Sequence, residues 1–109
     1  MQKYDIHYLP IAEEDLNEVV DYLLEHSINA ANRFIDELDG LEKSLSMFPE
    51  LGALSRDKKL RSRGYRMSVI GDYLLFYTIR HDHVYVMRVV HGKRNYLPLL
   101  KETERKRDI

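Results

Sequence analysis

Three β-rich runs with very short joints constrain the fold of this chain more than any other feature. The runs cover residues 65–70, 73–80 and 84–91. Gly71-Asp72 separates the first two runs, and His81-Asp82-His83 separates the second from the third. Joints of this length close β-hairpins, because they leave no room for a crossover connection. The second half of the chain is therefore predicted to form an antiparallel meander.

The first half carries one strand pattern followed by two helical patterns. Residues 3–9 alternate polar and apolar side chains, which is typical of a half-buried strand. Pro10 suits the first turn of a helix, and Ser27 or Asn29 can cap a second one. The first helical stripe is Ala12, Leu16, Val19, Val20, Leu23 and Leu24. The second is Ala31, Phe34, Ile35, Leu38, Leu41, Leu45 and Phe48, and Pro49 and Gly52 end it. Helices with so short a joint form an antiparallel hairpin.

The resulting order β-α-α-β-β-β predicts an α+β fold. One face of an antiparallel sheet of about four strands packs against the helical hairpin, giving two layers. The first strand must join the sheet, since an isolated strand leaves its backbone groups unpaired. Residues 53–63 are interpreted as a surface connection with a short helical turn. The tail after Tyr96 has room for one or two further turns. At 109 residues the chain is predicted to be a single domain, 1–109.

Composition excludes several kinds of chemistry. The chain has no cysteine, so neither disulfides nor thiolate metal sites can form. It lacks a glycine-rich phosphate loop and the Gly-x-Ser-x-Gly motif of serine hydrolases, and no cofactor is expected. The N-terminus lacks the apolar segment of a signal peptide, and no apolar run approaches the roughly 20 residues that span a bilayer. We expect a cytoplasmic protein without a membrane partner.

Charge is divided unevenly between the two halves. Residues 1–52 contain three basic and twelve acidic side chains, a net charge of −9. Residues 53–109 contain fourteen basic and six acidic ones, a net charge of +8. Such asymmetry indicates a polyanionic or acidic partner for the basic half. The alternative is that acidic helices and a basic sheet attract one another within the fold.

Most titratable clusters have a structural explanation. Glu13-Glu14-Asp15 is explained by solvation and by the positive end of a helix dipole. His81 and His83 lack a third ligand and are interpreted as a solvated turn, so no metal site is predicted. Arg88 interrupts the apolar file Val84, Val86, Val90 and belongs either to a site or to a buried pair with the acidic hairpin. We favour the pair, because an unpaired charge among valines is costly.

The segment His91-Gly92-Lys93-Arg94-Asn95 is the main candidate for function. It leaves a hydrophobic strand as a flexible, doubly basic segment, and a histidine can exchange protons near neutral pH. Its alternative interpretation is an ordinary strand exit with solvated charges. The candidate basic and polar surface comprises Arg66, His91, Lys93, Arg94 and Tyr96. Arginine suits phosphate or carboxylate, and tyrosine adds stacking. No catalytic residue is assigned.

The N-terminal strand, the helical hairpin and three further segments resemble the RelE/ParE superfamily, the toxins of type II toxin–antitoxin modules. The three further segments are the Phe48-Pro49-Glu50-Leu51-Gly52 turn, the 73–77 strand and residues 86–95, which run through Arg88 and His91-Gly92 into the basic pair. The resemblance covers nearly the whole chain. It implies a cognate antitoxin, which binds operator DNA through one end and wraps the toxin with an extended or helical segment.

The resemblance also implies one of two activities. RelE-like toxins cut messenger RNA on the ribosome with basic side chains and no metal, whereas ParE-like toxins, known as plasmid stabilisation proteins, inhibit DNA gyrase. Here Arg66 matches one RelE lysine, but Ser68 occupies the second lysine position and Leu74 the arginine position. Arg94 still matches the basic residue that follows the Gly-Lys pair. Phosphoryl transfer depends on such cations. The ParE-like interpretation is therefore favoured, and a gyrase inhibitor is expected rather than an enzyme. A ribosome-dependent ribonuclease and a non-toxic relic that only binds its antitoxin are the alternatives.

Overall fold

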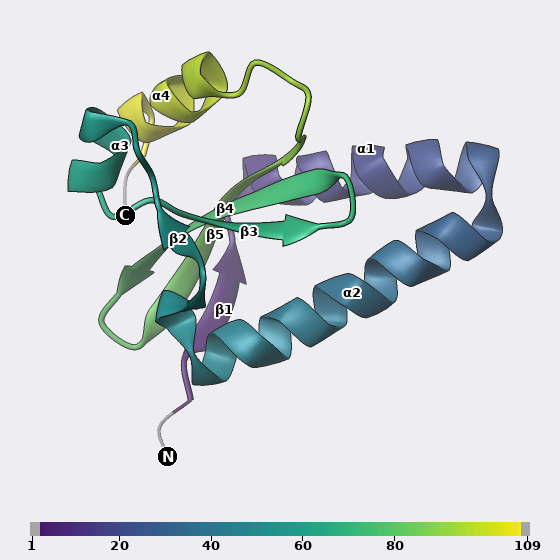
Figure 1. Cartoon of the computed structure of the whole chain (residues 1–109), viewed down its shortest axis with the longest axis horizontal. Coiled ribbons are helices and arrows are strands. Elements are labelled where there is room, and N and C mark those ends of the chain that lie inside the picture. Colours follow the sequence, from purple (N-terminus) through teal and green to yellow (C-terminus); the bar gives the residue numbers. More distant parts are fainter. Residues whose placement is uncertain (1–2, 108–109) are drawn as a thin grey trace.

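The computed structural model describes residues 3–107. It contains two long helices, two shorter ones, a 3-10 turn and five strands (Figure 1). In chain order these are β1 (Asp5–Tyr8), α1 (Pro10–His26), α2 (Ile28–Met47), η1 (Pro49–Leu51), β2 (Ala53–Leu54), α3 (Lys58–Ser62), β3 (Arg66–Ile70), β4 (Tyr73–Arg80), β5 (His83–His91) and α4 (Leu97–Arg105). No helix among the described residues is both long and apolar enough to cross a membrane.

The α+β architecture and the antiparallel meander are confirmed, but the sheet has five strands rather than about four. Its order is β1-β5-β4-β3-β2, with β1 parallel to β5 and every other neighbouring pair antiparallel. The unpredicted strand β2 has only two residues, which pair with Met67 and Arg66. So short a strand has no alternation that sequence analysis can detect.

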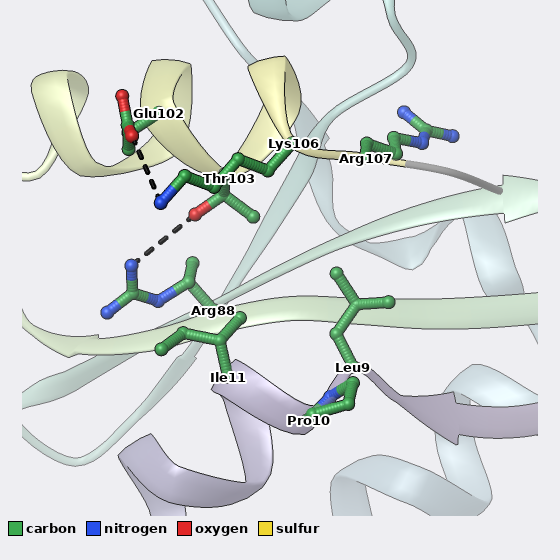
Figure 2. Close-up of a pocket in the computed structure, with 8 residues that line it drawn as sticks. All are labelled: Leu9, Pro10, Ile11, Arg88, Glu102, Thr103, Lys106 and Arg107. Carbon is green, nitrogen blue, oxygen red and sulfur yellow. Dashed lines mark hydrogen bonds and ion pairs between the residues drawn. The ribbon is translucent and has the colours of Figure 1, made fainter.

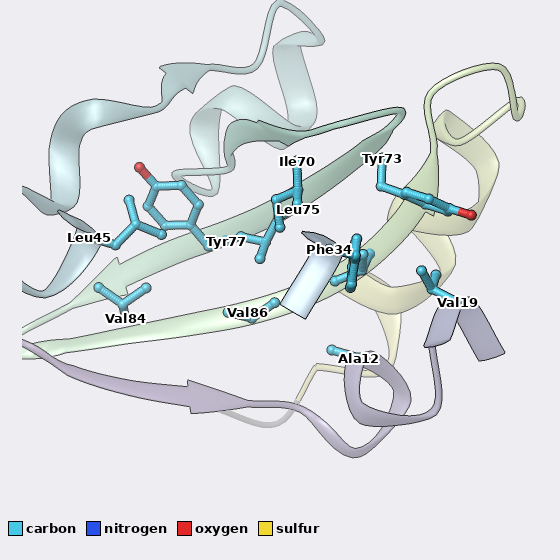
Figure 3. Close-up of a cluster of buried hydrophobic side chains, with 11 residues drawn as sticks. Ala12, Val19, Phe34, Leu45, Ile70, Tyr73, Leu75, Tyr77, Val84 and Val86 are labelled. Carbon is cyan, nitrogen blue, oxygen red and sulfur yellow. The ribbon is translucent and has the colours of Figure 1, made fainter. Parts of the chain in front are cut away.

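The helical hairpin packs on one sheet face, as predicted. Ser27 is the residue that caps α2, because its side chain accepts a hydrogen bond from the Ala30 N–H. The cluster beneath the hairpin joins both helices to three strands (Figure 3). Its buried members are Ala12, Val19, Phe34, Leu45, Ile70, Tyr73, Leu75, Tyr77, Val84, Val86 and Val89. Leu24, Ile35 and Phe48 were wrongly assigned to the buried stripes, since all three are exposed.

A second, smaller cluster covers the other sheet face under α3 and α4. It buries Leu60, Tyr65, Phe76, Met87, Val90 and Leu100. The predicted turn within residues 53–63 is the short helix α3, and the tail forms a nine-residue helix that begins at Leu97. Helices α3 and α4 lie next to each other, far from the joint between α1 and α2 (Figure 1).

A bulge in β5 changes which face its side chains reach. The register shifts between Phe76 and Tyr77, so that Arg88 lies opposite Phe76 while Val86 lies opposite Tyr77. Cross-strand partners share a face. Arg88 therefore lies on the face of the second cluster and does not interrupt the apolar file, which continues through Val89. The predicted file of alternate residues was wrong beyond Met87, because a bulge adds a residue that periodicity does not reveal.

Candidate functional site

Arg88 forms a buried ion pair with Asp15, the pair favoured from the sequence. The Arg88 Nε and Nη2 donate to the two carboxylate oxygens of Asp15 at 2.7 and 2.9 Å. The backbone N–H of Val89 donates to the same carboxylate at 2.9 Å. The paired carboxylate raises the pKa of Arg88 above its usual value, despite burial. The sequence interpretation of Asp15 as a solvated, dipole-stabilised acid was wrong. Its carboxylate instead binds the Val89 N–H on the edge of β5, beyond the residues that pair with β1.

The Pro49–Gly52 turn is held by Tyr77 and Arg66, which are cross-strand partners. The Tyr77 hydroxyl donates to the Pro49 carbonyl at 2.6 Å and accepts from the Gly52 N–H at 2.8 Å. Burial raises the pKa of this hydroxyl. The Arg66 Nη1 donates to the carbonyls of Glu50 and Gly52 at 3.1 and 2.7 Å. Arg66 therefore supports the turn through the backbone.

The His91–Asn95 segment is organised around the His91 ring. Its Nδ1 accepts from the Lys93 N–H at 3.1 Å, and the ring lies edge-on to Tyr73 with centroids 5.3 Å apart. The Gly92 N–H donates to the Asp72 carbonyl at 2.8 Å, which ties the segment to the β3–β4 turn. Lys93 and Arg94 are exposed. The loop thus presents two cations from a fixed base.

The five predicted surface residues do not form one site. His91 and Arg94 line a shallow pocket of about 160 Å³ beside the acidic helix α1. Arg66 and Tyr96 line a separate pocket of about 600 Å³ between β2 and the start of α4. Tyr96 also packs against Phe76, with ring centroids 5.0 Å apart. Lys93 lines neither pocket, so these residues border different hollows.

Ser68 and Leu74, the two positions where the sequence departs from the expected RelE-like pattern, lie on the sheet. Ser68 is half-buried and lies opposite Leu75. Leu74 is half-buried and packs against the second cluster, beside α3 and α4. Neither position supplies a cation, and the guanidinium of Arg66 is engaged by backbone carbonyls. No cationic side chain is therefore free at these three positions.

A buried carboxylate, Glu104, anchors α4 and was missed from the sequence. It accepts from the Tyr65 hydroxyl at 3.2 Å and pairs with Arg63 and Arg107 at 2.9 Å each. Burial, followed by the Glu104 charge, raises the pKa of Tyr65. The sequence contained no signal for this cluster, because Glu104 stands in a mostly charged tail that resembles a solvated one.

The charge asymmetry is not neutralised within the fold. Among the described residues, the ion pairs of the basic half lie mostly within that half, as with Lys101–Asp57, Arg63–Glu104 and Arg107–Glu104. Arg88–Asp15 is the exception that joins an arginine of the basic half to the acidic hairpin. The exposed cations of α3 and of the His91–Asn95 segment face solvent, whereas Lys101 and Arg105 of α4 pair with Asp57 and Glu102.

A groove runs between the start of α1 and the end of α4 (Figure 2). Its volume is about 330 Å³. Leu9, Pro10 and Ile11 form its apolar wall, while Glu102, Thr103, Lys106 and Arg107 line the opposite side, with Arg88 at its base. The Arg88 Nη1 donates to the Thr103 hydroxyl at 3.4 Å, so the buried pair also supports this groove. The groove thus combines an apolar wall with a polar side, on which Lys106 pairs with Glu102 and Arg107 with Glu104.

Comparison with known proteins gives consistent results. A chromosomal ParDE system from P. aeruginosa is similar in structure, with a TM-score of 0.64 and 14% identity over 84% of this chain and 98% of that one. The RelBE2 toxin–antitoxin complex from Mycobacterium tuberculosis has a TM-score of 0.57 and 24% identity, over 82% of this chain and 98% of that one. The YoeB dimer from Staphylococcus aureus has a TM-score of 0.54 and 22% identity, over 82% of this chain and 97% of that one. These likenesses show the fold. No match is found among curated proteins. The model of the ParE toxin of the type II toxin–antitoxin system parDE matches residues 6–96, and the chain therefore belongs to this toxin family.

Proposed function

We propose that this protein inhibits cell growth by acting on DNA gyrase in the cytoplasm. The observation that carries the proposal is the absence of free cations at three of the positions where the RNA-cutting branch of the superfamily has them, although Arg94 still matches a fourth. Leu74 packs into an apolar cluster, Ser68 is uncharged, and Arg66 binds backbone carbonyls. Phosphodiester cleavage without a metal needs such charges at the scissile phosphate. A surface that binds a protein target does not.

The exposed pair Lys93 and Arg94 is the proposed contact with gyrase. Both side chains leave a loop whose backbone is fixed through His91 and Asp72. Cations on a rigid base bind an acidic surface with little loss of conformational freedom. Truncating the pair should therefore weaken binding of the target while leaving the fold intact.

A supercoiling assay with purified gyrase tests this proposal. The wild-type protein should inhibit supercoiling, and the double variant Lys93→Ala/Arg94→Ala should need at least about tenfold more protein for the same inhibition. The matched control is Arg33→Ala/Lys43→Ala, which removes two exposed cations from α2 and should inhibit like the wild type. If the wild-type protein arrests growth but leaves supercoiling unchanged, the gyrase mechanism is wrong. Toeprinting on translating ribosomes then shows whether it cleaves messenger RNA instead.

A cognate antitoxin is the second proposed partner, and the groove between α1 and α4 is its proposed docking site. The ParDE and RelBE2 relatives are toxin–antitoxin systems by description. An apolar anchor in the groove would contact Ile11, while an acidic residue beside it would compete with Glu102 for the exposed Lys106. This combination of an apolar groove and a charged rim suits a helical or extended peptide segment.

Co-expression with the antitoxin tests this docking site separately from toxicity. Ile11→Asp places a charge on the apolar wall of the groove and should allow growth arrest even when the antitoxin is present. Ile28→Asp is the matched control, because Ile28 is an exposed isoleucine at the start of α2, outside the groove. If the antitoxin rescues growth equally in both variants, the groove is not its docking site. A protein that binds the antitoxin but never arrests growth would be a relic.

A further inference from the structure

Two histidines and an aspartate meet where the first strand joins the sheet. The parallel pairing of β1 with β5 sets Asp5 beside His83 and His7 beside Tyr85. Side chains two residues apart on a strand share a face, so Asp5 and His7 point the same way as His83. One ligand atom from each of Asp5, His7 and His83 lies within 4.8 Å of the other two. The sequence offered His81 as the partner of His83, but the structure brings in His7 from across the sheet.

The two imidazoles face each other through ring nitrogens. The His7 Nε2 lies 2.9 Å from the His83 Nδ1, and an oxygen of Asp5 lies 3.9 Å from the same Nδ1. Two nitrogen ligands about 2.0–2.1 Å from one ion are separated by about 2.9 Å at a right angle, as in octahedral or square-planar sites, and by about 3.4 Å at the tetrahedral angle that Zn²⁺ prefers. The observed separation therefore already matches a bidentate imidazole pair. Without an ion, the same two nitrogens share a single hydrogen bond.

The ring of His7 is held in place by a neighbouring aromatic ring. It stacks on Tyr85 with centroids 5.1 Å apart and an interplanar angle of 23°. The Asp5 N–H donates to the Asp82 carbonyl at 3.0 Å, which fixes the backbone next to His83. A chelating pair that is oriented in advance loses less conformational freedom on binding an ion. The ligands are also reachable, since the side chains of His83 and Asp5 are 40% and 75% exposed.

We propose that Asp5, His7 and His83 bind a divalent transition-metal ion that joins β1 to β5. Two imidazoles and one carboxylate suit Zn²⁺, Ni²⁺, Co²⁺ or Cu²⁺, whereas Ca²⁺ and Mg²⁺ prefer oxygen ligands. Solvent completes the coordination on the exposed side. The two strands are joined by four residue pairs at the sheet edge, so a shared ion stabilises the folded chain by linkage.

Isothermal titration calorimetry of the untagged, full-length protein with NiCl₂ or ZnCl₂ tests the site. We expect one ion to bind per chain, and added Mg²⁺ should leave its affinity almost unchanged. The variants His7→Gln and His83→Gln should each bind the ion at least about tenfold more weakly. His81→Asn is the matched control, because His81 belongs to the same turn and its positive φ of 55° is tolerated by asparagine. This variant should bind the ion like the wild type.

Two further measurements keep the test independent of folding. Saturating Ni²⁺ should broaden the ring resonances of His7 and His83, but not that of His26 on α1, in the NMR spectrum of the wild-type protein. Zn²⁺ at about a hundred times its Kd should raise the Tm by roughly 10 °C. If the wild-type protein binds neither ion, or if both histidine variants bind as tightly as the wild type, the proposal is wrong.

Discussion

Removing the carboxylate of Asp15 should destabilise this protein more than any change at its surface. Asp15→Ala leaves Arg88 without a counter-charge in a place where the side chains of the pair are only 8% and 10% exposed. It also removes the acceptor of the Val89 N–H. Breaking a buried pair from one side costs about 3–5 kcal/mol, because the remaining charge stays desolvated. The free energy of unfolding of a small domain is about 5–15 kcal/mol, so this loss is a large fraction of its total stability.

Urea denaturation followed by circular dichroism measures this loss of free energy, and thermal denaturation measures the corresponding fall in Tm. At roughly 4 °C of Tm per kcal/mol, the Tm of Asp15→Ala should fall by about 12–20 °C. Glu14→Ala is the control, because Glu14 is the exposed acid next in the chain and its removal should change the free energy of unfolding by no more than about 0.5 kcal/mol. Asp15 is the main cause of the raised pKa of Arg88, so the variant loses this effect while burial still lowers the pKa. Arginine is nevertheless so basic that alkaline buffer up to about pH 10 should leave it charged and should not relieve the defect.

A double variant separates the unpaired charge from simple loss of contacts. Asp15→Leu/Arg88→Met removes both charges and keeps apolar volume, so it should be at least about 1.5 kcal/mol more stable than Asp15→Ala. It should not recover fully, because the Val89 N–H still lacks its acceptor. If the double variant is no more stable than Asp15→Ala, or if Asp15→Ala costs less than about 1 kcal/mol, the buried-charge explanation is wrong.

Three further predictions concern the turn after α2 and the cap of α3. Gly52→Ala should lower the free energy of unfolding by about 2 kcal/mol or more in urea denaturation, since a Cβ there would lie 2.7 Å from the Tyr77 hydroxyl and from a backbone oxygen. Tyr77→Phe should cost about 1–3 kcal/mol in the same assay, because it removes the buried hydroxyl that satisfies two backbone groups of the turn. The Leu60 N–H lowers the pKa of Asp57, so this carboxylate stabilises the fold above its usual pKa and stops doing so as the pH falls through the lowered value. The Tm difference between wild type and Asp57→Ala should therefore be full at neutral pH and shrink as the pH falls below the usual aspartate range.

The sequence predicted those elements that repeat a pattern over several residues. The periodicity of apolar residues predicted the hairpin helices and the three meander strands. The cost of unpaired backbone groups predicted that β1 joins the sheet. Two-residue β2 and the bulge at Met87 have no such pattern, so both were missed. Leu24 and Phe48 were assigned to the core because a stripe shows which face is apolar, but not how far the neighbouring layer extends.

The candidate site was predicted less well, because its contacts depend on tertiary structure. The pairing of Arg88 with the acidic hairpin followed from the cost of an isolated buried charge, but its partner Asp15 was read as solvated. The meeting of His7 with His83 requires the parallel register of β1 and β5, which no local spacing determines. The surface predicted around Arg66 and Tyr96 lies apart from Arg94, for the same reason.

The distribution of ion pairs favours an acidic partner as the interpretation of the charge asymmetry. If the acidic helices merely neutralised the basic half, most of its cations would be paired across the fold. Among the described residues, Asp15–Arg88 is the pair that joins an arginine of that half to the hairpin, while Glu104 and Asp57 hold other cations within it. Lys93 and Arg94 remain exposed on a fixed loop. Uncompensated cations repel one another in the free protein, and an acidic partner relieves that repulsion on binding. Complex formation through this half should therefore slow steeply as salt is raised, and a rate that is independent of salt would place the contact elsewhere.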